Sequence, residues 1–216
     1  MNYQKFSQEW QQCSLPLVAI LRGVTPAEAE GVALTLVECG FTYLEVPMNS
    51  PSPLESIRIM ADVLSGRAYV GAGTVLTPQQ VVGVAQAGGQ LIISPNADVA
   101  VIEASCALNL ISLPGVTTPS EAFRALQAGA HGLKLFPAEI VTPAVTKALR
   151  AVLPREVICL PVGGIAADAA QMRTYVQAGA QGFGLGGGLY QPGMSLISLR
   201  EKADAYRHAW QQSLDG

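Results

Sequence analysis

The sequence predicts one TIM (β/α)8 barrel, an α/β fold, and three observations lead to this prediction. Four segments repeat one pattern, in which a helix ends at a glycine and a strand follows: 37–46, 85–94, 126–135 and 176–185. Eight apolar runs start 19 to 26 residues apart, the spacing that one strand, one helix and two short loops require. Each run is followed by a helix-start signal. Eight such units favour a closed barrel over the alternative, a doubly wound open sheet.

The elements follow one another in a regular order. The strands are predicted to start near residues 17, 43, 69, 91, 110, 132, 157 and 182. Four helices are expected to end at glycines, which adopt the left-handed C-cap conformation without steric cost: Gly40, Gly88, Gly129 and Gly179. Helix starts are marked by an N-cap side chain, in most cases with a proline at the first helical position: Thr25-Pro26, Ser52-Pro53, Thr77-Pro78, residues 96–98, Thr118-Pro119, Thr142-Pro143, Asp168 and Ser195.

The first residues do not have the basic patch and following apolar stretch that are typical of a secretory signal. Residues 1–14 are polar and predict a short amphipathic helix, while residues 15–216 are assigned to the barrel as a single catalytic domain. The longest early apolar run, 15–21, is far shorter than the roughly 20 residues that span a bilayer. The four cysteines are widely spaced and form no C-x-x-C pair, which favours reduced thiols. A cytoplasmic protein without membrane contact is therefore expected.

Composition argues against two kinds of partner. Only 13% of the residues are charged and 50% are hydrophobic, which indicates extensive burial. The net charge is −3 and the Lys and Arg residues form no run, so nucleic acid is not an expected partner. Only His131 and His208 are present, too few for a histidine-rich zinc site and a poor basis for a His-based triad. No metal and no other cofactor is predicted.

A lysine stands inside the predicted strand that starts near residue 132. Side chains of a barrel strand alternate between the helices and the interior, and barrel active sites lie at the carboxyl ends of the strands. If Leu133 and Leu135 face the helices, Lys134 points inward, and the same alternation in YLEVPMN turns Glu45 inward. Burial should lower the pKa of Lys134, so that its free amine can condense with a ketone while Glu45 moves protons. A purely structural Lys–Glu ion pair is the alternative, although such pairs add little net stability.

Two further polar residues end strands at the same face of the barrel. Arg22 ends the first strand and Thr74 the third, so both are candidate site residues. Each also has a structural interpretation: Arg22 could cap a loop, and Thr74 could cap a helix or a turn.

Glycine clusters follow the last two strands, as PVGGI (161–165) and GFGLGGGLY (182–190). In barrels, backbone N–H groups of these loops hold a phosphate. The predicted ligands are Gly163, Gly164, Gly186 and Gly187, whereas Gly184 could simply pack the eighth strand. The match of GFGLGG to G-x-G-x-x-G lies in the last unit, so a dinucleotide fold is not expected.

Five motifs, in order, now carry a resemblance that covers residues 15–192: AILRGV (19–24), LEVPMNSP (44–51), GAGTVL (71–76), GLKLFPAE (132–139) and PVGGI. Together they resemble the KDPG/KDPGal family of class I aldolases, which split 2-keto-3-deoxy-6-phosphosugar acids. The resemblance implies a carbon–carbon lyase without metal and a homotrimer of barrels. Its expected partners are a phosphorylated keto-deoxy sugar acid and pyruvate.

The resemblance also implies roles for single residues. Lys134 would form the Schiff base, Glu45 would act as general acid and base, Thr74 would lie near the pyruvyl carboxylate, and the glycine loops would bind phosphate. The predicted reaction is reversible C3–C4 cleavage into pyruvate and D-glyceraldehyde 3-phosphate.

Departures from the pattern of the gluconate-specific members bear on the substrate. Those members resemble EVTLRT and Thr-Gly-Gly where this chain has EVPMNS and Val162-Gly163-Gly164. Asn49 thus replaces a carboxylate-binding arginine, and Arg22 is placed to supply that cation. Val162 removes a hydroxyl beside substrate C4, and losing one buried hydrogen-bonding group can shift discrimination by about 1–3 kcal/mol. Both features favour 2-dehydro-3-deoxy-6-phosphogalactonate over its gluconate epimer.

One departure concerns the phosphate, and two other functions remain open. The second phosphate loop has Gly186, Gly187 and Gly188 where relatives commonly place a serine, which predicts weaker phosphate affinity. An isomerase or epimerase on the same barrel would need an acid–base pair but no imine. A sugar-phosphate binder would bind without turnover.

Overall fold

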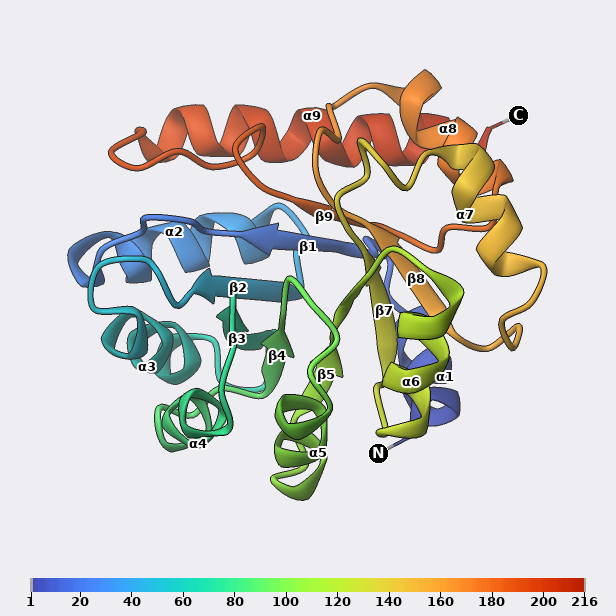
Figure 1. Cartoon of the computed structure of the whole chain (residues 1–216). Coiled ribbons are helices and arrows are strands. Elements are labelled where there is room, and N and C mark those ends of the chain that lie inside the picture. Colours follow the sequence, from blue (N-terminus) through green and yellow to red (C-terminus); the bar gives the residue numbers. More distant parts are fainter. Residues whose placement is uncertain (1, 216) are drawn as a thin grey trace.

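Parallel strands and helices alternate along the chain in the computed structural model, which describes residues 2–215 (Figure 1). The strands are β1 (Leu17–Ile20), β2 (Tyr43–Pro47), β3 (Tyr69–Gly73), β4 (Leu91–Ile93), β5 (Ile111–Leu113), β6 (Gly115–Val116), β7 (Gly132–Leu135), β8 (Ile158–Pro161) and β9 (Phe183–Leu185). The helices are α1 (Tyr3–Gln11), α2 (Pro26–Glu38), α3 (Pro53–Val63), α4 (Pro78–Gln86), α5 (Val99–Ala107), α6 (Pro119–Gln127), α7 (Pro143–Arg150), α8 (Ala169–Gln177) and α9 (Leu196–Leu214).

The strands form the predicted barrel from two parallel sheets, ordered β5-β4-β3-β2-β1-β9 and β6-β7-β8. The fifth barrel strand is divided into β5 and β6 by Pro114, which has no N–H to donate. Its carbonyl still accepts a hydrogen bond from Lys134 N at 2.9 Å, which joins the two sheets. On the other side, Val162 bridges Gly184. The predicted eight-strand barrel is therefore confirmed, with one strand in two parts.

The predicted helix boundaries are also confirmed. Each of the eight proposed N-cap positions directly precedes a helix from α2 to α9. At Thr118, threonine and Glu121 form a reciprocal capping box. The four terminating glycines all have positive φ, from +83° to +101°, a conformation that other residues adopt only at a cost: Gly40, Gly88, Gly129 and Gly179.

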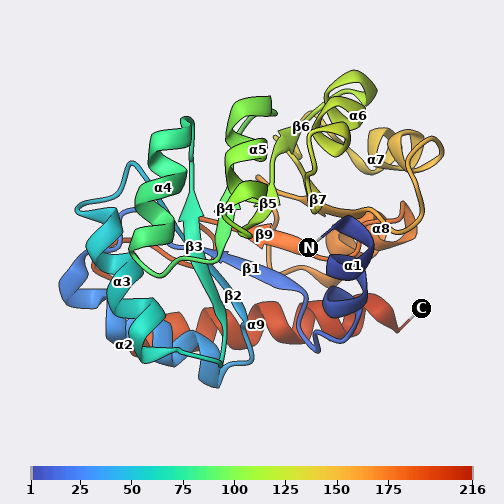
Figure 2. The same cartoon turned by 90° about the horizontal axis from the view of Figure 1, so that it is seen from below.

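Helix α1 covers the amino-terminal end of the barrel (Figure 2). Its Phe6 and Trp10 are buried against Tyr43, and Trp10 Nε1 donates to the carbonyl of Gln181 at 2.8 Å. The helix lies within the predicted range 1–14. The boundary between that range and residues 15–216 stays a prediction, and residues 1 and 216 lie outside the described residues.

Side chains of the strands alternate between two apolar layers. Leu133 and Leu135 pack against Ala122 and Ala125 of α6, outside the barrel. The interior layer is a separate cluster, formed with the side chains of α1: Phe6, Trp10, Val18, Tyr43, Leu91, Ile93, Ile111, Leu113, Ile158 and Leu160. Because Leu133 and Leu135 face the helices, Lys134 between them faces the interior, as the alternation predicts.

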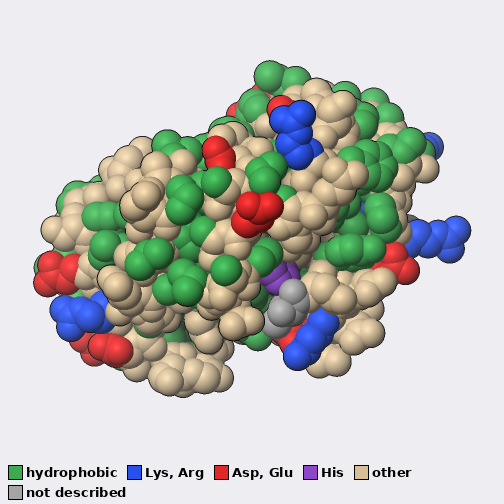
Figure 3. All heavy atoms as spheres, turned by 60° about the horizontal axis from the view of Figure 1, so that its bottom comes forward, with side chains coloured by type: hydrophobic (Ala, Val, Ile, Leu, Met, Phe, Trp, Pro, Cys, Tyr) green, Lys and Arg blue, Asp and Glu red, His purple; other side chains and the backbone are tan. Residues whose placement is uncertain are grey.

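The surface is of mixed character. On the face drawn in Figure 3, Lys and Arg side chains are separated from one another and form no continuous patch. Within residues 2–215, every helix is too short or too polar to cross a membrane. The four cysteines are free thiols, with Cys39 and Cys159 buried.

Candidate active site

A cavity of about 900 Å³ opens at the carboxyl ends of the strands. Its wall includes Arg22 after β1, Thr74 after β3, Lys134 from β7, Val162 after β8 and the glycine loop after β9. The chain therefore brings together residues separated by more than 160 positions, at the end of the barrel where the strand alternation places them.

Lys134 is 8% exposed. Its Nζ lies 4.6 Å from the centre of the Phe136 ring. Burial lowers the pKa of Lys134, which the Glu45 carboxylate opposes by its negative charge and the Arg22 guanidinium reinforces. Burial therefore outweighs attraction to the carboxylate, and the free amine becomes more abundant near neutral pH.

Glu45 is 1% exposed in the middle of β2. Burial raises the pKa of Glu45 to about 7, although Lys134, Arg22 and a hydrogen bond from the Gly73 amide act in the opposite direction. Within residues 2–215, its Oε2 has no hydrogen-bond partner. A carboxyl group with this pKa can both accept and donate a proton near neutral pH.

The alternative of a structural ion pair finds no support in the geometry. Among residues 2–215, no ion pair within 4.0 Å joins Lys134 to Glu45. Burial moves both pKa values toward the uncharged forms. Two groups whose uncharged forms are favoured contribute little to stability as an ion pair. They suit a reaction in which each group must gain and lose a proton.

Gly73 makes room for the Glu45 carboxylate. A Cβ at this position would lie 1.9 Å from Oε2 of Glu45 and 2.2 Å from Oε1. The motif GAGTVL contains this glycine, but the sequence does not predict its role, because its contact with Glu45 depends on the pairing of β2 with β3. Phe136 was missed for a similar reason, since its approach to Lys134 depends on the bend after β7.

Arg22 and Asn49 act together at the ends of β1 and β2. Nη1 of Arg22 donates to Oδ1 of Asn49 at 2.6 Å, which fixes the guanidinium at the cavity wall. Asn49 itself is not among the described residues that line this wall. Thr74 is on the wall and has a positive φ of 55°, a strained conformation for a β-branched residue.

The four predicted loop glycines all line the cavity: Gly163, Gly164, Gly186 and Gly187. In residues 2–215, their amides donate no hydrogen bond to another group of the protein. A Cβ at Gly186 or Gly187 would meet no heavy atom within 4 Å, so this stretch of backbone borders open space. Unpaired amides facing a cavity are suited to bind an anion.

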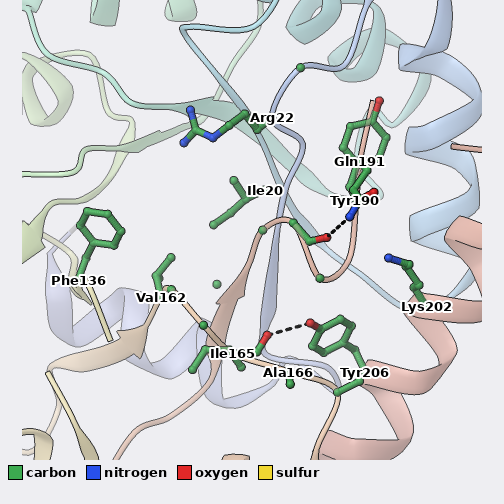
Figure 4. A pocket seen from close by; sticks show the side chains of 18 of the residues that line it. Ile20, Arg22, Phe136, Val162, Ile165, Ala166, Tyr190, Gln191, Lys202 and Tyr206 are labelled. Carbon is green, nitrogen blue, oxygen red and sulfur yellow. Dashed lines mark hydrogen bonds between the residues drawn. The ribbon is translucent and has the colours of Figure 1, made fainter. Parts of the chain in front are cut away.

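Val162 lies on the wall between the lysine and these loops, 8% exposed. Figure 4 shows its side chain opposite Phe136 and Ile20. A Cβ at Gly184 would lie 2.7 Å from Cγ2 of Val162, so this glycine makes room for the valine. The interpretation of Gly184 as a packing residue is therefore supported.

Among the described residues, the charged side chains on the cavity wall are all cationic. Its lining contains three cationic side chains, Arg22, Lys134 and Lys202, and, within residues 2–215, no Asp or Glu. Lys202 comes from α9 and was not predicted, because the rotation of that helix toward the barrel is set by packing. Such a cavity suits a ligand with several negative charges. In the described part of the chain, no three His, Cys, Asp or Glu residues are grouped as a metal site would require.

Comparison with known proteins agrees with this chemistry. A family model described as KDPG and KHG aldolase matches residues 11–200. The chain is 46% identical over 190 residues to a probable 2-dehydro-3-deoxy-6-phosphogalactonate aldolase of Rhizobium meliloti, covering 88% of this chain and 89% of the relative. It is 40% identical over 206 residues to 2-dehydro-3-deoxy-6-phosphogalactonate aldolase of Escherichia coli, covering 95% and 99%.

Two further similarities extend the comparison. A KHG/KDPG aldolase of Escherichia coli is 34% identical over 167 residues, covering 76% of this chain and 77% of the relative. A solved structure described as native KDPGal superposes with a TM-score of 0.91 at 40% identity, covering 95% of this chain and 98% of that one.

Proposed function

This chain belongs to the KDPG and KHG aldolase family, and on that premise we propose that it cleaves 2-dehydro-3-deoxy-6-phospho-D-galactonate into pyruvate and D-glyceraldehyde 3-phosphate. The observation that carries the proposal is the buried pair of Lys134 and Glu45, whose pKa values are shifted in opposite directions, with Lys134 on the wall of a cavity lined by cations and glycine loops.

The reaction starts at Lys134. Its free amine adds to the C2 ketone of the substrate. The carbinolamine that forms takes up one proton from solvent and loses water, which gives a protonated Schiff base, and the same proton is released when this base is hydrolysed at the end of the cycle. Burial favours the addition, because it lowers the pKa of Lys134 and so increases the fraction of free amine. Arg22 and Thr74 bind the C1 carboxylate at the same face, and the unpaired amides of the glycine loops bind the C6 phosphate.

Bond cleavage needs a base for the C4 hydroxyl. Glu45 as carboxylate removes that proton, the C3–C4 bond breaks, and its electron pair moves into the Schiff base to form an enamine. The aldehyde leaves. The protonated Glu45 then gives its proton to C3 of the enamine, and water releases pyruvate from Lys134. Each proton that is taken up is returned, so Glu45 and the free amine of Lys134 are regenerated at the end of the cycle.

The epimer preference is the part of the proposal that a single assay tests. Equal concentrations of the galactonate and gluconate epimers are cleaved side by side, and pyruvate is measured with lactate dehydrogenase. The galactonate epimer is expected to have a kcat/KM about tenfold higher or more. A preference for the gluconate epimer would replace the proposal by the alternative that the KHG/KDPG relative favours.

Val162→Thr tests the origin of this preference. A hydroxyl beside substrate C4 is expected to shift the ratio of kcat/KM values toward the gluconate epimer by about 1–3 kcal/mol, or roughly 5- to 150-fold. Val157→Thr is the control, because Val157 is also buried but belongs to the helix-facing layer. An unchanged ratio in Val162→Thr would show that another residue selects the epimer.

Assembly and location are proposed with the same function. We infer a homotrimer from family membership, and a cytoplasmic enzyme of galactonate breakdown from its four free thiols and the phosphorylated substrate. Size-exclusion chromatography with light scattering would test the trimer.

A further inference from the structure

Lys202 lines the cavity at the end where the glycine loops lie. It stands on α9, one turn before Tyr206, whose hydroxyl donates to the carbonyl of Ile165 at 2.8 Å. This hydrogen bond ties α9 to the loop after β8. Figure 4 shows the Lys202 amine pointing from α9 toward the loop that follows β9, well apart from Arg22.

Among the described residues, no ion pair compensates the charge of Lys202. Its neighbours on α9, Arg200 and Arg207, form ion pairs with Glu38 and Asp204. For Lys202, residues 2–215 provide no carboxylate within 4.0 Å. A half-buried ammonium beside an anion-binding loop, with no partner of its own, is available to a ligand.

The other polar side chains that line this end of the cavity are occupied or neutral, and the Glu139 carboxylate, which lies beside Gly163 and Gly164, is outside that lining. The Tyr206 hydroxyl is used by Ile165, and Nε2 of Gln191 donates to the carbonyl of Gly187 at 3.3 Å. Burial raises the pKa of Tyr190 to about 12, so it stays uncharged. The loop glycines supply N–H groups but no hydroxyl and no charge. A doubly charged phosphate held only by amides would lack a counter-charge here.

We propose that Lys202 binds the substrate phosphate together with the amides of the two glycine loops. Its ammonium provides the charge at the far end of the cavity, as Arg22 does for the carboxylate at the near end. The inference rests on the proposed function for the identity of the substrate. It also changes the expectation of weak phosphate affinity drawn from the missing serine, because a cation from another element takes over the contact.

The test replaces Lys202 by methionine, which keeps length and removes charge. For the phosphorylated sugar acid, KM is expected to rise about tenfold with kcat unchanged. Cleavage of the same sugar acid without phosphate should be unaffected. Inorganic phosphate should inhibit the variant less than the wild type by a similar factor. Lys202→Arg should restore most of the affinity.

Lys147→Met is the matched control, since Lys147 is exposed on α7 and lies outside the cavity. An unchanged KM in Lys202→Met would overturn the inference, and so would an equal loss on both substrates. Failure of the proposed function gives a different result, because the wild-type enzyme would then cleave neither epimer.

Discussion

Replacing Lys134 by arginine is expected to lower kcat by about 10⁴-fold or more, the largest effect of any single change in this chain. A guanidinium cannot lose its proton near neutral pH, so it cannot add to the ketone. The measurement is trapping with pyruvate and borohydride, followed by peptide mass spectrometry. The wild type should carry one reduced adduct on the peptide that contains Lys134 and lose activity, whereas the variant should carry none.

Two results would contradict this prediction. An adduct on another lysine, such as Lys202, would place the covalent centre elsewhere in the same cavity. Residual activity in Lys134→Arg near the wild-type rate would favour an isomerase or epimerase, which needs no imine. Lys147→Arg, on the exposed side of α7, controls for the effect of the substitution itself.

Glu45→Gln separates the proton transfers from the covalent step. We expect kcat to fall by about 10² to 10⁴-fold, because glutamine has the same shape but cannot accept the C4 proton. Pyruvate should still be trapped on Lys134. Removing the carboxylate takes away the interaction that raises the pKa of Lys134, so the amine remains available.

The dependence of the cleavage rate on pH tests the role of the Glu45 carboxylate. Cleavage needs Glu45 as carboxylate, and burial raises its pKa to about 7. The rate of the wild type should therefore rise as pH increases through about 7, and it should fall on the acid side as the carboxylate is protonated. The residual rate of Glu45→Gln should lack this inflection. An identical inflection in the variant would assign the titration to another group.

Local chemistry made much of the fold predictable. The Thr-Pro and Ser-Pro pairs and the single Asp and Ser caps each determine one helix start, so the boundaries needed no tertiary information. The inward direction of Lys134 and Glu45 followed from the two-residue period of a strand. The division of the fifth strand at Pro114 was not predicted, because a proline at a strand end and one inside a strand look alike in sequence.

The site residues that the sequence did not predict depend on contacts between helices and strands. The register of β2 against β3 places Gly73 beside Glu45, and the rotation of α9 places Lys202 at the cavity. Neither the register nor the rotation can be read from a short sequence motif. Asn49 was expected to shape specificity directly. That role stays a prediction, and the structure adds a hydrogen bond from Arg22 to Asn49 that the sequence did not indicate.

The closure of the amino-terminal end of the barrel by α1 affects the order of events in a catalytic cycle. Phe6 and Trp10 join the apolar interior below Lys134, and the cavity that contains Lys134 opens at the opposite end of the barrel. Under the proposed chemistry, the phosphorylated half of the substrate lies nearer that opening and the keto acid half is attached to the lysine. Product release is then ordered: the aldehyde leaves before pyruvate, and a new substrate molecule binds only after pyruvate has left.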